Sequence, residues 1–392
     1  MQQRLTIGLL WHSTHSANLG VGALTLGHLA LLDRLTERLG IVPRYVVLGA
    51  RDPVPDYIVR EDVETVAIPD RQMLRPIGGL GAALRPCDVV LDIGAGDSFA
   101  DIYGVRRFLR LTVPKIAALM LKRPLVLAPQ TIGPFERPWV RRMAVATMDR
   151  ADLVASRDTR STDYLKHLGH RGPAIEATDV ALLLPHTPPP KARKDQRIRV
   201  GLNVSGLLFA GGYHGGNQFG LALDYPSLIR HLLASLTADE RIEVHLIGHV
   251  LAPSGAVEDD HNVCERLAGE FPGTICAPRF AGGPSEAKSY IAGMDVFAGA
   301  RMHACIAAFS TGVAVVPMAY SRKFAGLFGT LGYDLVADLK VEDAASVEAK
   351  ILDAIERRQT LSKAARAGTA RGLKRLERYE TALTPILKGC AR

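Results

Sequence analysis

Near its start, this 392-residue chain reads Leu5-Thr-Ile-Gly-Leu-Leu-Trp11, and this segment indicates the fold class. Its apolar run is short, which favours a buried strand over a helix. A polar loop follows, then a helical pattern over residues 22–39, and then a second apolar strand, Tyr45-Val-Val-Leu48. Two strands separated by a helix of this length indicate a βαβ unit with parallel strands. The sequence therefore predicts an α/β protein.

The same alternation continues on both sides of a proline-rich segment. Further strands are predicted at 88–93, 124–128, 153–156, 199–204, 242–247, 295–298 and 314–319. Helices are predicted at 113–122, 139–148, 159–167, 225–236, 259–270, 285–291, 303–310, 344–358 and 361–387. The segment His186-Thr-Pro-Pro-Pro-Lys-Ala-Arg-Lys-Asp-Gln-Arg197 is typical of a linker. We therefore expect two facing, doubly wound, Rossmann-like domains, at 1–185 and 199–342, a linker at 186–198 and C-terminal helices at 343–392.

Composition favours a globular protein with anionic partners. Hydrophobic residues make up 47% of the chain and charged residues 22%, which is ordinary for a folded domain. The net charge of +8 favours phosphorylated small molecules, an anionic membrane surface or nucleic acid. Aromatic residues are only 6% and are not interleaved with the basic clusters, so we expect no nucleic-acid partner. Peripheral membrane association and a homo-oligomer stay open.

Cysteine usage and hydropathy indicate a cytoplasmic protein. The five cysteines are odd in number and never spaced as CxxC, which predicts reduced thiols and neither a disulfide framework nor a zinc site. The N-terminus leads directly into a strand, unlike a signal peptide. No apolar run reaches the ~20 residues that cross a bilayer. A position at the inner face of the membrane stays open.

Several common site motifs are absent from the sequence. There is no GxGxxG after the first strand, no GxxxxGK[ST] and no GxSxG. His245 and His249 are four apart, but on and after a predicted strand, where they would not converge. His12 and His15 lack a third ligand nearby. We therefore expect no metal and no dinucleotide cofactor.

Polar residues that directly follow the predicted strands are the site candidates, because doubly wound sheets bind ligands beyond the carboxyl ends of their strands. The first loop contains Asn18-Leu-Gly20 before a helix, where backbone N–H groups could hold an anion. The alternative is that its glycines serve only tight packing of strand and helix. Gln130 and Arg157 follow two later strands, and a guanidinium suits phosphate or carboxylate.

The loop Gly94-Ala-Gly-Asp-Ser-Phe-Ala-Asp-Ile-Tyr-Gly104 carries two carboxylates. Asp97 and Asp101 are four apart and would share a face if the loop enters a helix here. Together they could orient sugar hydroxyls or take a proton from one. The alternative is that Asp97 or Ser98 merely caps a helix.

The second half of the chain has its most informative residues at 299–307. Arg301 and His303 follow a predicted strand at the start of an apolar helix, where the helix dipole favours anions. Against this, a lone histidine is more often structural than catalytic. Tyr320-Ser-Arg-Lys323 then places further cations after the next strand.

Taken together, these motifs resemble the polysaccharide pyruvyl transferase family from about residue 5 to residue 330. The matching pieces are Asn18-Leu-Gly20, Gly94-Ala-Gly-Asp-Ser-Phe-Ala-Asp101, Pro129-Gln-Thr-Ile-Gly-Pro134, Ser156-Arg-Asp158 with Ser161, Asp179-Val-Ala181, Arg301-Met-His303 and Tyr320-Ser-Arg-Lys323. The resemblance implies a fold like that of the two-domain GT-B glycosyltransferases. It also implies transfer of a pyruvyl group from phosphoenolpyruvate to a sugar of a glycan or lipid-linked glycan precursor, as in exopolysaccharide or cell-envelope synthesis.

The resemblance also assigns roles to residues. It implies that His303 and Arg157 act on phosphoenolpyruvate in catalysis and that Arg301 binds it. Asn18 and the catalytic Asp97 would lie on the acceptor side. The further residues implied to bind substrate are Met302, Asp101, Gln130 and Lys323. One position departs from the family, since Val21 stands where an acidic residue often follows the glycine, so Asp97 or Asp101 would serve as the acceptor-side base.

The chemistry of ketal formation agrees with these residue types. Arginines can grip the phosphate and carboxylate of phosphoenolpyruvate with paired hydrogen bonds. A histidine beside bound anions can protonate the methylene carbon. One sugar hydroxyl then adds, phosphate leaves, and a second hydroxyl closes the ring, with no metal or cofactor.

Two other classes of function remain as alternatives. A GT-B nucleotide-sugar glycosyltransferase would use the arginines and histidine for a diphosphate and would release a nucleoside diphosphate. A non-catalytic sugar-binding protein would have no need of Arg157, Arg301 and His303.

Overall fold

A computed structural model describes residues 3–49, 54–69, 78–96, 98–190, 196–253 and 255–392. The chain forms two compact units. Unit 1 comprises Met1–Ser16, Leu24–Leu183 and Gly372–Arg392, and unit 2 comprises Ala17–Ala23 and Leu184–Arg371. Each unit contains one parallel β-sheet and its helices, so the predicted α/β class is confirmed.

The sheet of unit 1 has seven strands in the order β3-β2-β1-β4-β5-β6-β7. These are β1 (Gln3–Leu10), β2 (Ile41–Gly49), β3 (Val63–Ala67), β4 (Val89–Asp92), β5 (Leu125–Gln130), β6 (Leu153–Ser156) and β7 (Ala174–Glu176). β1 pairs with β2 on one side and β4 on the other, all parallel, so the order reverses between β1 and β4. Every residue of β4, β5 and β6 is buried, because helices cover both faces of a parallel sheet.

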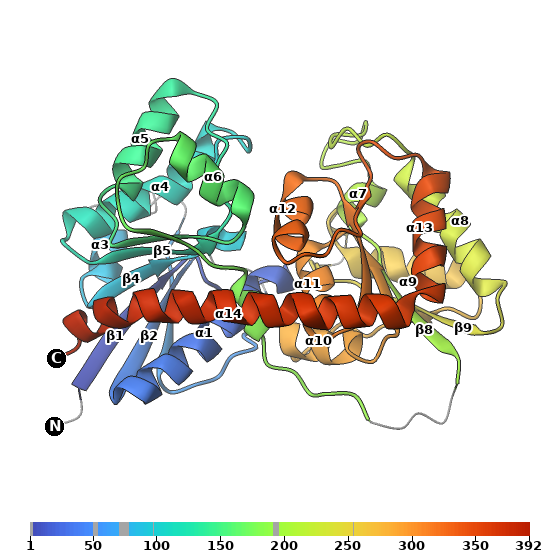
Figure 1. Cartoon of the computed structure of the whole chain (residues 1–392), viewed down its shortest axis with the longest axis horizontal. Coiled ribbons are helices and arrows are strands. Elements are labelled where there is room, and N and C mark those ends of the chain that lie inside the picture. Colours follow the sequence, from blue (N-terminus) through green and yellow to red (C-terminus); the bar gives the residue numbers. More distant parts are fainter. Residues whose placement is uncertain (1–2, 50–53, 70–77, 97, 191–195, 254) are drawn as a thin grey trace. The chain divides into compact units, whose positions relative to one another are not determined.

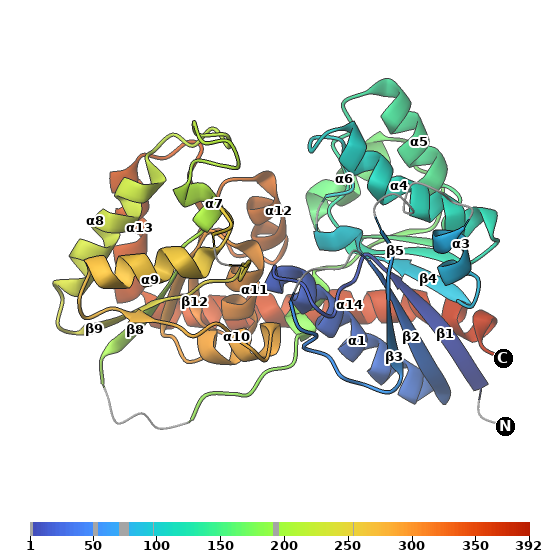
Figure 2. The same ribbon diagram turned by 180° about the vertical axis from the view of Figure 1, so that it is seen from behind.

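Helices cover this sheet on both sides (Figures 1 and 2). They are α1 (Leu19–Leu39), α3 (Gly79–Leu84), α4 (Val105–Met120), α5 (Pro138–Met148), α6 (Thr159–His167) and α14 (Arg358–Cys390). α3, α4, α5 and α6 lie on one face of the sheet, and α1 with the C-terminal part of α14 lies on the other. Two 3₁₀ turns, η1 (Gly94–Gly96) and η2 (Val180–Leu183), complete the unit.

The sheet of unit 2 has six strands in the order β10-β9-β8-β11-β12-β13. These are β8 (Ile198–Asn203), β9 (Ile242–Leu246), β10 (Ile275–Cys276), β11 (Val296–Gly299), β12 (Ala314–Ala319) and β13 (Ala337–Asp338). Its helices are α7 (Gly206–Phe209), α8 (Tyr225–Thr237), α9 (Asp260–Glu270), α10 (Pro284–Ile291), α11 (Met302–Ser310), α12 (Arg322–Thr330) and α13 (Ala344–Glu356). The order reverses between β8 and β11, so this sheet is also doubly wound.

The C-terminal helices do not form a part of their own. α13 and the first turns of α14 belong to unit 2, whereas Gly372–Arg392 belongs to unit 1. Tyr379 of α14 is fully buried there, and its hydroxyl lies 3.1 Å from Nε2 of His28. Nδ1 of His28 in turn lies 3.0 Å from Nε2 of His12. This buried row of polar groups fixes the end of the chain to α1 and to the loop after β1.

Some elements were not expected from the pattern. β3, β7, β10 and β13 are short or edge strands with few buried residues, so they lack the apolar run that identifies a central strand. The first helix begins at Leu19 instead of residue 22. Asp101 does not lie in a helix, because residues 98–104 form a β-bridge, bends and a turn, and α4 starts only at Val105.

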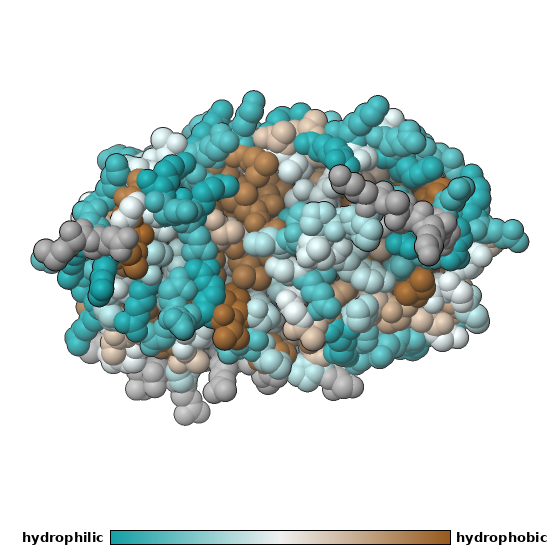
Figure 3. Space-filling view, turned by 90° about the horizontal axis from the view of Figure 1, so that it is seen from below, coloured by the Kyte–Doolittle hydropathy of each residue, from teal (hydrophilic) through white to brown (hydrophobic). Residues whose placement is uncertain are grey.

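No helix among the described residues combines the length and the apolar character needed to cross a membrane. On the face that Figure 3 shows, polar residues cover much of the surface and apolar residues gather in separate areas.

Candidate active site

The switch point of unit 2 lies where β8 and β11 end side by side. Asn203, the last residue of β8, pairs with Gly299, the last residue of β11. Oδ1 of Asn203 accepts a hydrogen bond of 2.8 Å from the backbone N–H of Arg301, and its Nδ2 donates to the carbonyl of Ile247 at 2.8 Å. Asn203 therefore fixes the turn that leads from β11 into α11. Sheets of this type bind ligands at such a point.

Arg301 is the N-cap residue of α11 and forms an ion pair with Asp260 at the start of α9. Its Nη2 lies 2.7 Å from Oδ1 of Asp260, and its Nε lies 3.1 Å from Oδ2. Burial by itself lowers the pKa of Arg301, but the adjacent Asp260 carboxylate outweighs it, and the pKa is raised. The guanidinium therefore stays charged. Within the described parts of the chain its Nη1 has no hydrogen-bond partner.

Asp260 was not among the candidates from the sequence, although it holds the site together. Its side chain is fully buried. Besides Arg301 it accepts hydrogen bonds from the backbone N–H groups of Gly206 (2.8 Å), His249 (3.1 Å) and Val250 (2.9 Å). These contacts tie the loops after β8 and β9 to the loop after β11. The only sequence signal was a carboxylate at the start of a helix, which usually indicates a simple cap.

His303 is the second residue of α11 and is half-buried. The first turn of α1, which belongs to unit 2, lies against it. A Cβ atom on Gly20 would lie 2.5 Å from Nδ1 of His303. The turn is held by the N–H of Leu19, which donates to the carbonyl of His249, and by a β-bridge between Asn18 and Val250. Asn18 therefore belongs to the same unit as His303.

His249 adds a neutral imidazole to this cluster. It is 2% exposed, and desolvation by burial lowers its pKa to about 3, with a further lowering from the nearby charges of His303 and Arg301. The group consisting of Arg301, His303, His249 and the first turn of α1 is called the switch-point cluster below.

A glycine-rich loop lies next to the switch-point cluster and was missed by sequence reasoning. It runs from Ala210 to Gly220 between α7 and α8, and five of its glycines have positive φ angles: Gly211, Gly212, Gly215, Gly216 and Gly220. Tyr213 of this loop donates a hydrogen bond of 2.8 Å to Glu258, whose backbone carbonyl accepts from Arg301. The ring of Phe219 packs edge-on against Tyr320, at 5.3 Å between centroids. The run of glycines was the available signal.

Met302 and Lys323 also lie in unit 2. Met302 is buried as the first residue of α11. Lys323 is half-buried as the second residue of α12, after the end of β12. Together with Asn18, Arg301 and His303, they make up the predicted site residues in this unit.

Arg157 lies in unit 1, directly after β6, and its side chain is 2% exposed. Its Nη1 lies 2.9 Å from Oδ2 of Asp179, and its Nε donates to Oγ1 of Thr131 at 2.8 Å. The guanidinium therefore joins the loops after β5, β6 and β7 within the unit.

Asp101 was predicted to bind substrate, but both of its carboxylate oxygens are occupied by the protein. They accept from the backbone N–H groups of Glu136 (2.8 Å) and Arg137 (3.2 Å) and from the Arg137 guanidinium (3.2 Å). Burial raises the pKa of Asp101, but these hydrogen bonds outweigh it, and the pKa lies below its usual value. Asp101 thus holds the loop that begins α5. Asp97 lies outside the described residues.

Gln130 takes part in a buried polar network at the switch point of unit 1. Its Nε2 lies 3.1 Å from both the backbone carbonyl and Oδ2 of Asp92 at the end of β4. Oδ2 of Asp92 also lies 3.0 Å from Nζ of Lys115, and both side chains are fully buried. Burial lowers the pKa of Lys115 despite this carboxylate. No group of three or more metal-ligating side chains occurs among the residues described.

The two doubly wound sheets and the long C-terminal helix are similar to the fold of GT-B proteins. Three solved structures illustrate the likeness of fold. Sucrose-phosphate synthase from Thermosynechococcus elongatus has a TM-score of 0.59 at 11% identity, with 98% of this chain and 99% of that chain covered. Anabaena HepE in complex with UDP and glucose has a TM-score of 0.57 at 16% identity, with 98% and 100% covered. S. aureus MnaA with UDP has a TM-score of 0.58 at 12% identity, with 97% and 98% covered.

Sequence comparison identifies the family. Residues 26–322 match the polysaccharide pyruvyl transferase family, so the chain belongs to that family and is a transferase. Comparison with curated proteins gives no match.

Proposed function

We propose that the protein transfers a pyruvyl group from phosphoenolpyruvate to two hydroxyls of one sugar in a glycan, forming a pyruvate ketal and releasing phosphate. The observation that carries this proposal is the switch-point cluster, where a largely buried arginine that keeps its charge lies two residues before a half-buried histidine at a helix N-terminus. Arginine and the positive end of the helix dipole both favour a small, multiply charged anion. Phosphoenolpyruvate is such an anion.

The roles follow from the chemistry of the donor. Arg301 binds the donor through its Nη1 side, while Asp260 holds the rest of the guanidinium in place. His303 donates a proton to the methylene carbon, and a sugar hydroxyl adds to the adjacent carbon. Phosphate then leaves with the electron pair of the C–O bond, and the second hydroxyl closes the ring. Of the two hydroxyl protons, one replaces the proton that His303 gave to carbon, and the other leaves with phosphate.

The proposed reaction also needs a base for the acceptor hydroxyls. Of the two candidate bases, Asp97 and Asp101, Asp101 is fully engaged with the start of α5. We therefore assign the acceptor-side base to Asp97. In this proposal Arg157 does not bind the donor. It holds the loops after β5 and β7 in place through Thr131 and Asp179.

A nucleotide-sugar donor is the second candidate, because two of the similar solved structures are described as complexes with UDP. A ribose would need a carboxylate that can accept its hydroxyls. Near the switch-point cluster, Asp260 is paired with Arg301, Asp259 lies 2.6 Å from Arg279, and Glu258 accepts from Tyr213. Because these three carboxylates are already paired within the protein, the cluster favours phosphoenolpyruvate, the smaller anion, over a nucleotide sugar.

The proposed reaction takes place in the cytoplasm and uses no cofactor. All five cysteines are free thiols, which suits a reducing compartment. The glycan acceptor is a polymer or a lipid-linked precursor at the inner face of the membrane.

The experiment is a product assay with both donor classes. The purified enzyme is incubated with a panel of model glycosides and either phosphoenolpyruvate or UDP-sugars, and released phosphate and nucleoside diphosphate are measured. We expect acceptor-dependent phosphate release and a product 70 Da heavier than the acceptor (roughly, for one added pyruvate ketal). Binding is checked by thermal shift, since a ligand of the native site raises the melting midpoint. Stabilisation and turnover with UDP-sugars alone would contradict the proposal.

A further inference from the structure

One face of unit 1 combines exposed aromatic side chains with several exposed arginines. It is formed by the loop before α4, the first turn of α4, and α5 with the loop before it, and is called the α4–α5 face below. Its members are Ile102, Tyr103, Arg106, Arg137, Trp139, Arg141, Arg142 and Arg150. None of these residues takes part in the switch-point cluster.

The apolar members lie close together because Asp101 joins the two loops. Its carboxylate accepts from the backbone N–H groups of Glu136 and Arg137, which places residues 102–103 beside the start of α5. Trp139 packs edge-on against Phe108 of α4, at 6.3 Å between ring centroids. Even so, Ile102, Tyr103 and Trp139 remain 43%, 45% and 42% exposed. Exposed apolar side chains that gather in one patch, unlike single scattered ones, indicate an interaction site.

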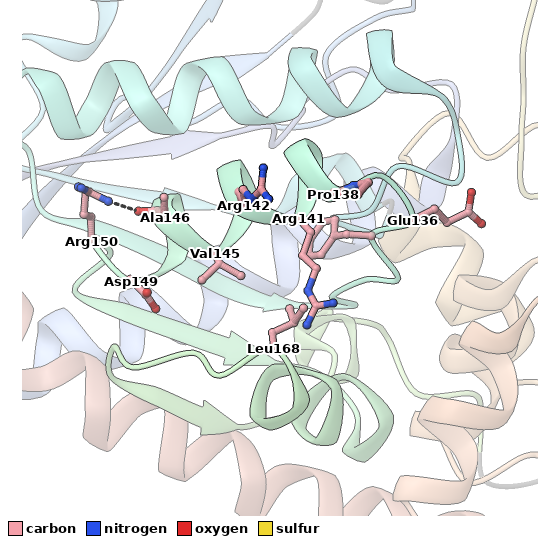
Figure 4. Close-up of a pocket in the computed structure, with 10 residues that line it drawn as sticks. Glu136, Pro138, Arg141, Arg142, Val145, Ala146, Asp149, Arg150 and Leu168 are labelled. Carbon is pink, nitrogen blue, oxygen red and sulfur yellow. Dashed lines mark hydrogen bonds between the residues drawn. The ribbon is translucent and has the colours of Figure 1, made fainter.

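The arginines on α5 carry charge that the protein does not neutralise. Arg141 and Arg142 are exposed and form no ion pair with any described residue, and Arg150 donates to a carbonyl, that of Ala146. Figure 4 shows Arg141, Arg142 and Arg150 around a shallow pocket along α5. Two acidic residues, Glu136 and Asp149, also line this pocket, and Asp149 is already held by His170 at 2.7 Å. The face therefore has a net positive charge.

We propose that the α4–α5 face docks the enzyme on a membrane surface rich in anionic lipid. Arginine is attracted to anionic headgroups, and each basic residue near such a surface strengthens binding about fivefold. Tryptophan and tyrosine prefer the boundary between headgroups and acyl chains, and isoleucine can enter the acyl layer beneath it. A surface with both kinds of side chain fits a lipid surface better than a soluble polyanion, which would use the arginines alone. The proposal does not depend on which donor the enzyme uses.

The experiment uses the full chain and vesicles of defined composition. One set contains phosphatidylcholine only, and the other contains phosphatidylcholine with about one third phosphatidylglycerol. The two tryptophans of the chain make fluorescence a local probe, because Trp11 is 3% exposed and Trp139 is at the α4–α5 face. We expect sedimentation with the anionic vesicles only, a blue shift of Trp139 emission, and weaker binding at high salt.

A matched pair of charge reversals tests the location of the docking surface. Arg141→Glu with Arg142→Glu should reduce binding at least tenfold. Lys374→Glu with Arg378→Glu makes the same change of charge on α14, on the opposite face of unit 1, at exposed residues, and should leave most binding intact. Trp139→Phe should abolish the blue shift and weaken binding less.

Several outcomes would overturn the proposal. Equal losses from both charge reversals would mean that net charge alone drives binding. Undiminished binding by the α5 variant would place the surface elsewhere. Binding to heparin beads but not to anionic vesicles would indicate a soluble polyanion. Turnover of a water-soluble glycoside acceptor should be the same for the α5 variant and the parent, so a failure of docking is distinguishable from a failure of the proposed reaction.

Discussion

Gly20 and His303 approach each other so closely that only glycine fits at position 20. A Cβ atom there would lie 2.5 Å from Nδ1 and 2.9 Å from Cγ of the imidazole. The backbone does not demand glycine, because Gly20 is helical and has no positive φ angle. In a helix, alanine is favoured over glycine by about 1 kcal/mol. The close approach of His303 therefore accounts for the glycine, and the first turn of α1 sets the position of the imidazole.

Gly20→Ala should therefore reduce turnover without a large loss of donor binding. The added methyl must push the His303 ring away from its position, and a misplaced general acid costs on the order of 10²-fold in kcat. Steady-state kinetics should show a fall in kcat with little change in the KM for phosphoenolpyruvate. Gly329→Ala, at an exposed helical glycine with no neighbour within 4 Å, is the matched control and should keep parental kinetics. Parental kcat in a Gly20→Ala enzyme would contradict the positioning role.

His303→Gln should remove about 10² to 10⁴ in kcat, the contribution typical of general acid catalysis. The variant should fold normally and keep the thermal shift with phosphoenolpyruvate, because Arg301 still binds the donor. His231→Gln, at an exposed histidine on α8, serves as the control. If the His303 variant melts earlier but turns over like the parent, the histidine only packs against the start of α11.

Asp260→Asn should lower stability and donor affinity together. The substitution leaves the buried Arg301 charge without its partner, and breaking a buried ion pair costs about 3–5 kcal/mol of unfolding free energy. Arg301 also loses the contacts that orient it, so the KM for phosphoenolpyruvate should rise. The double variant with Arg301→Met should recover part of the stability but not the donor affinity. A denaturant titration and donor kinetics on the same proteins measure both effects; additive losses would mean that the two residues act independently.

Arg157→Lys separates the two roles suggested for this arginine. Lysine cannot contact both Asp179 and Thr131, so we expect a loss of about 1.5–3 kcal/mol in unfolding free energy, the value of a hydrogen bond to a charged group. The KM for phosphoenolpyruvate should change little. A large rise in that KM with unchanged stability would instead return Arg157 to the donor site that the family resemblance implies.

Stability should fall as the pH drops below 6.5. Desolvation by burial lowers the pKa of His12 to about 3, and burial together with the charge of His12 lowers that of His28. The unfolded chain therefore binds more protons than the folded one between about pH 6.5 and pH 3. Each such histidine removes about 1.4 kcal/mol of stability per pH unit as pH falls through that window. Denaturation at pH 7.5, 6.0 and 5.0 measures the slope.

A substitution tests whether the buried histidines His12 and His28 cause this dependence of stability on pH. His12→Gln should make the decline of stability with falling pH shallower, whereas the exposed His231→Gln should leave it unchanged. An equal slope in the parent and the His12 variant would show that other groups control the acid response.

The central strands of both sheets, and the placement of Arg301 and His303 after one of them, can be predicted from the sequence alone. Apolar runs of four to eight residues, bounded by polar loops, identify buried parallel strands because burial on both faces leaves no place for polar side chains. Residues directly after such strands must lie at the carboxyl edge of the sheet. The prediction of the Arg301-Met302-His303 turn needs no more information than this.

Which distant segments share a site becomes visible only in the folded protein. Asn18 and Gly20 contact the loop after β9 and the start of α11, more than 200 residues away, through a β-bridge and a close approach that no local pattern encodes. Likewise, Asp260 is an ordinary helix-start carboxylate in the sequence and becomes the partner of Arg301 only in the folded unit. Local periodicity records whether a position is buried or exposed, but the identity of its neighbour depends on how strands and loops pack in three dimensions.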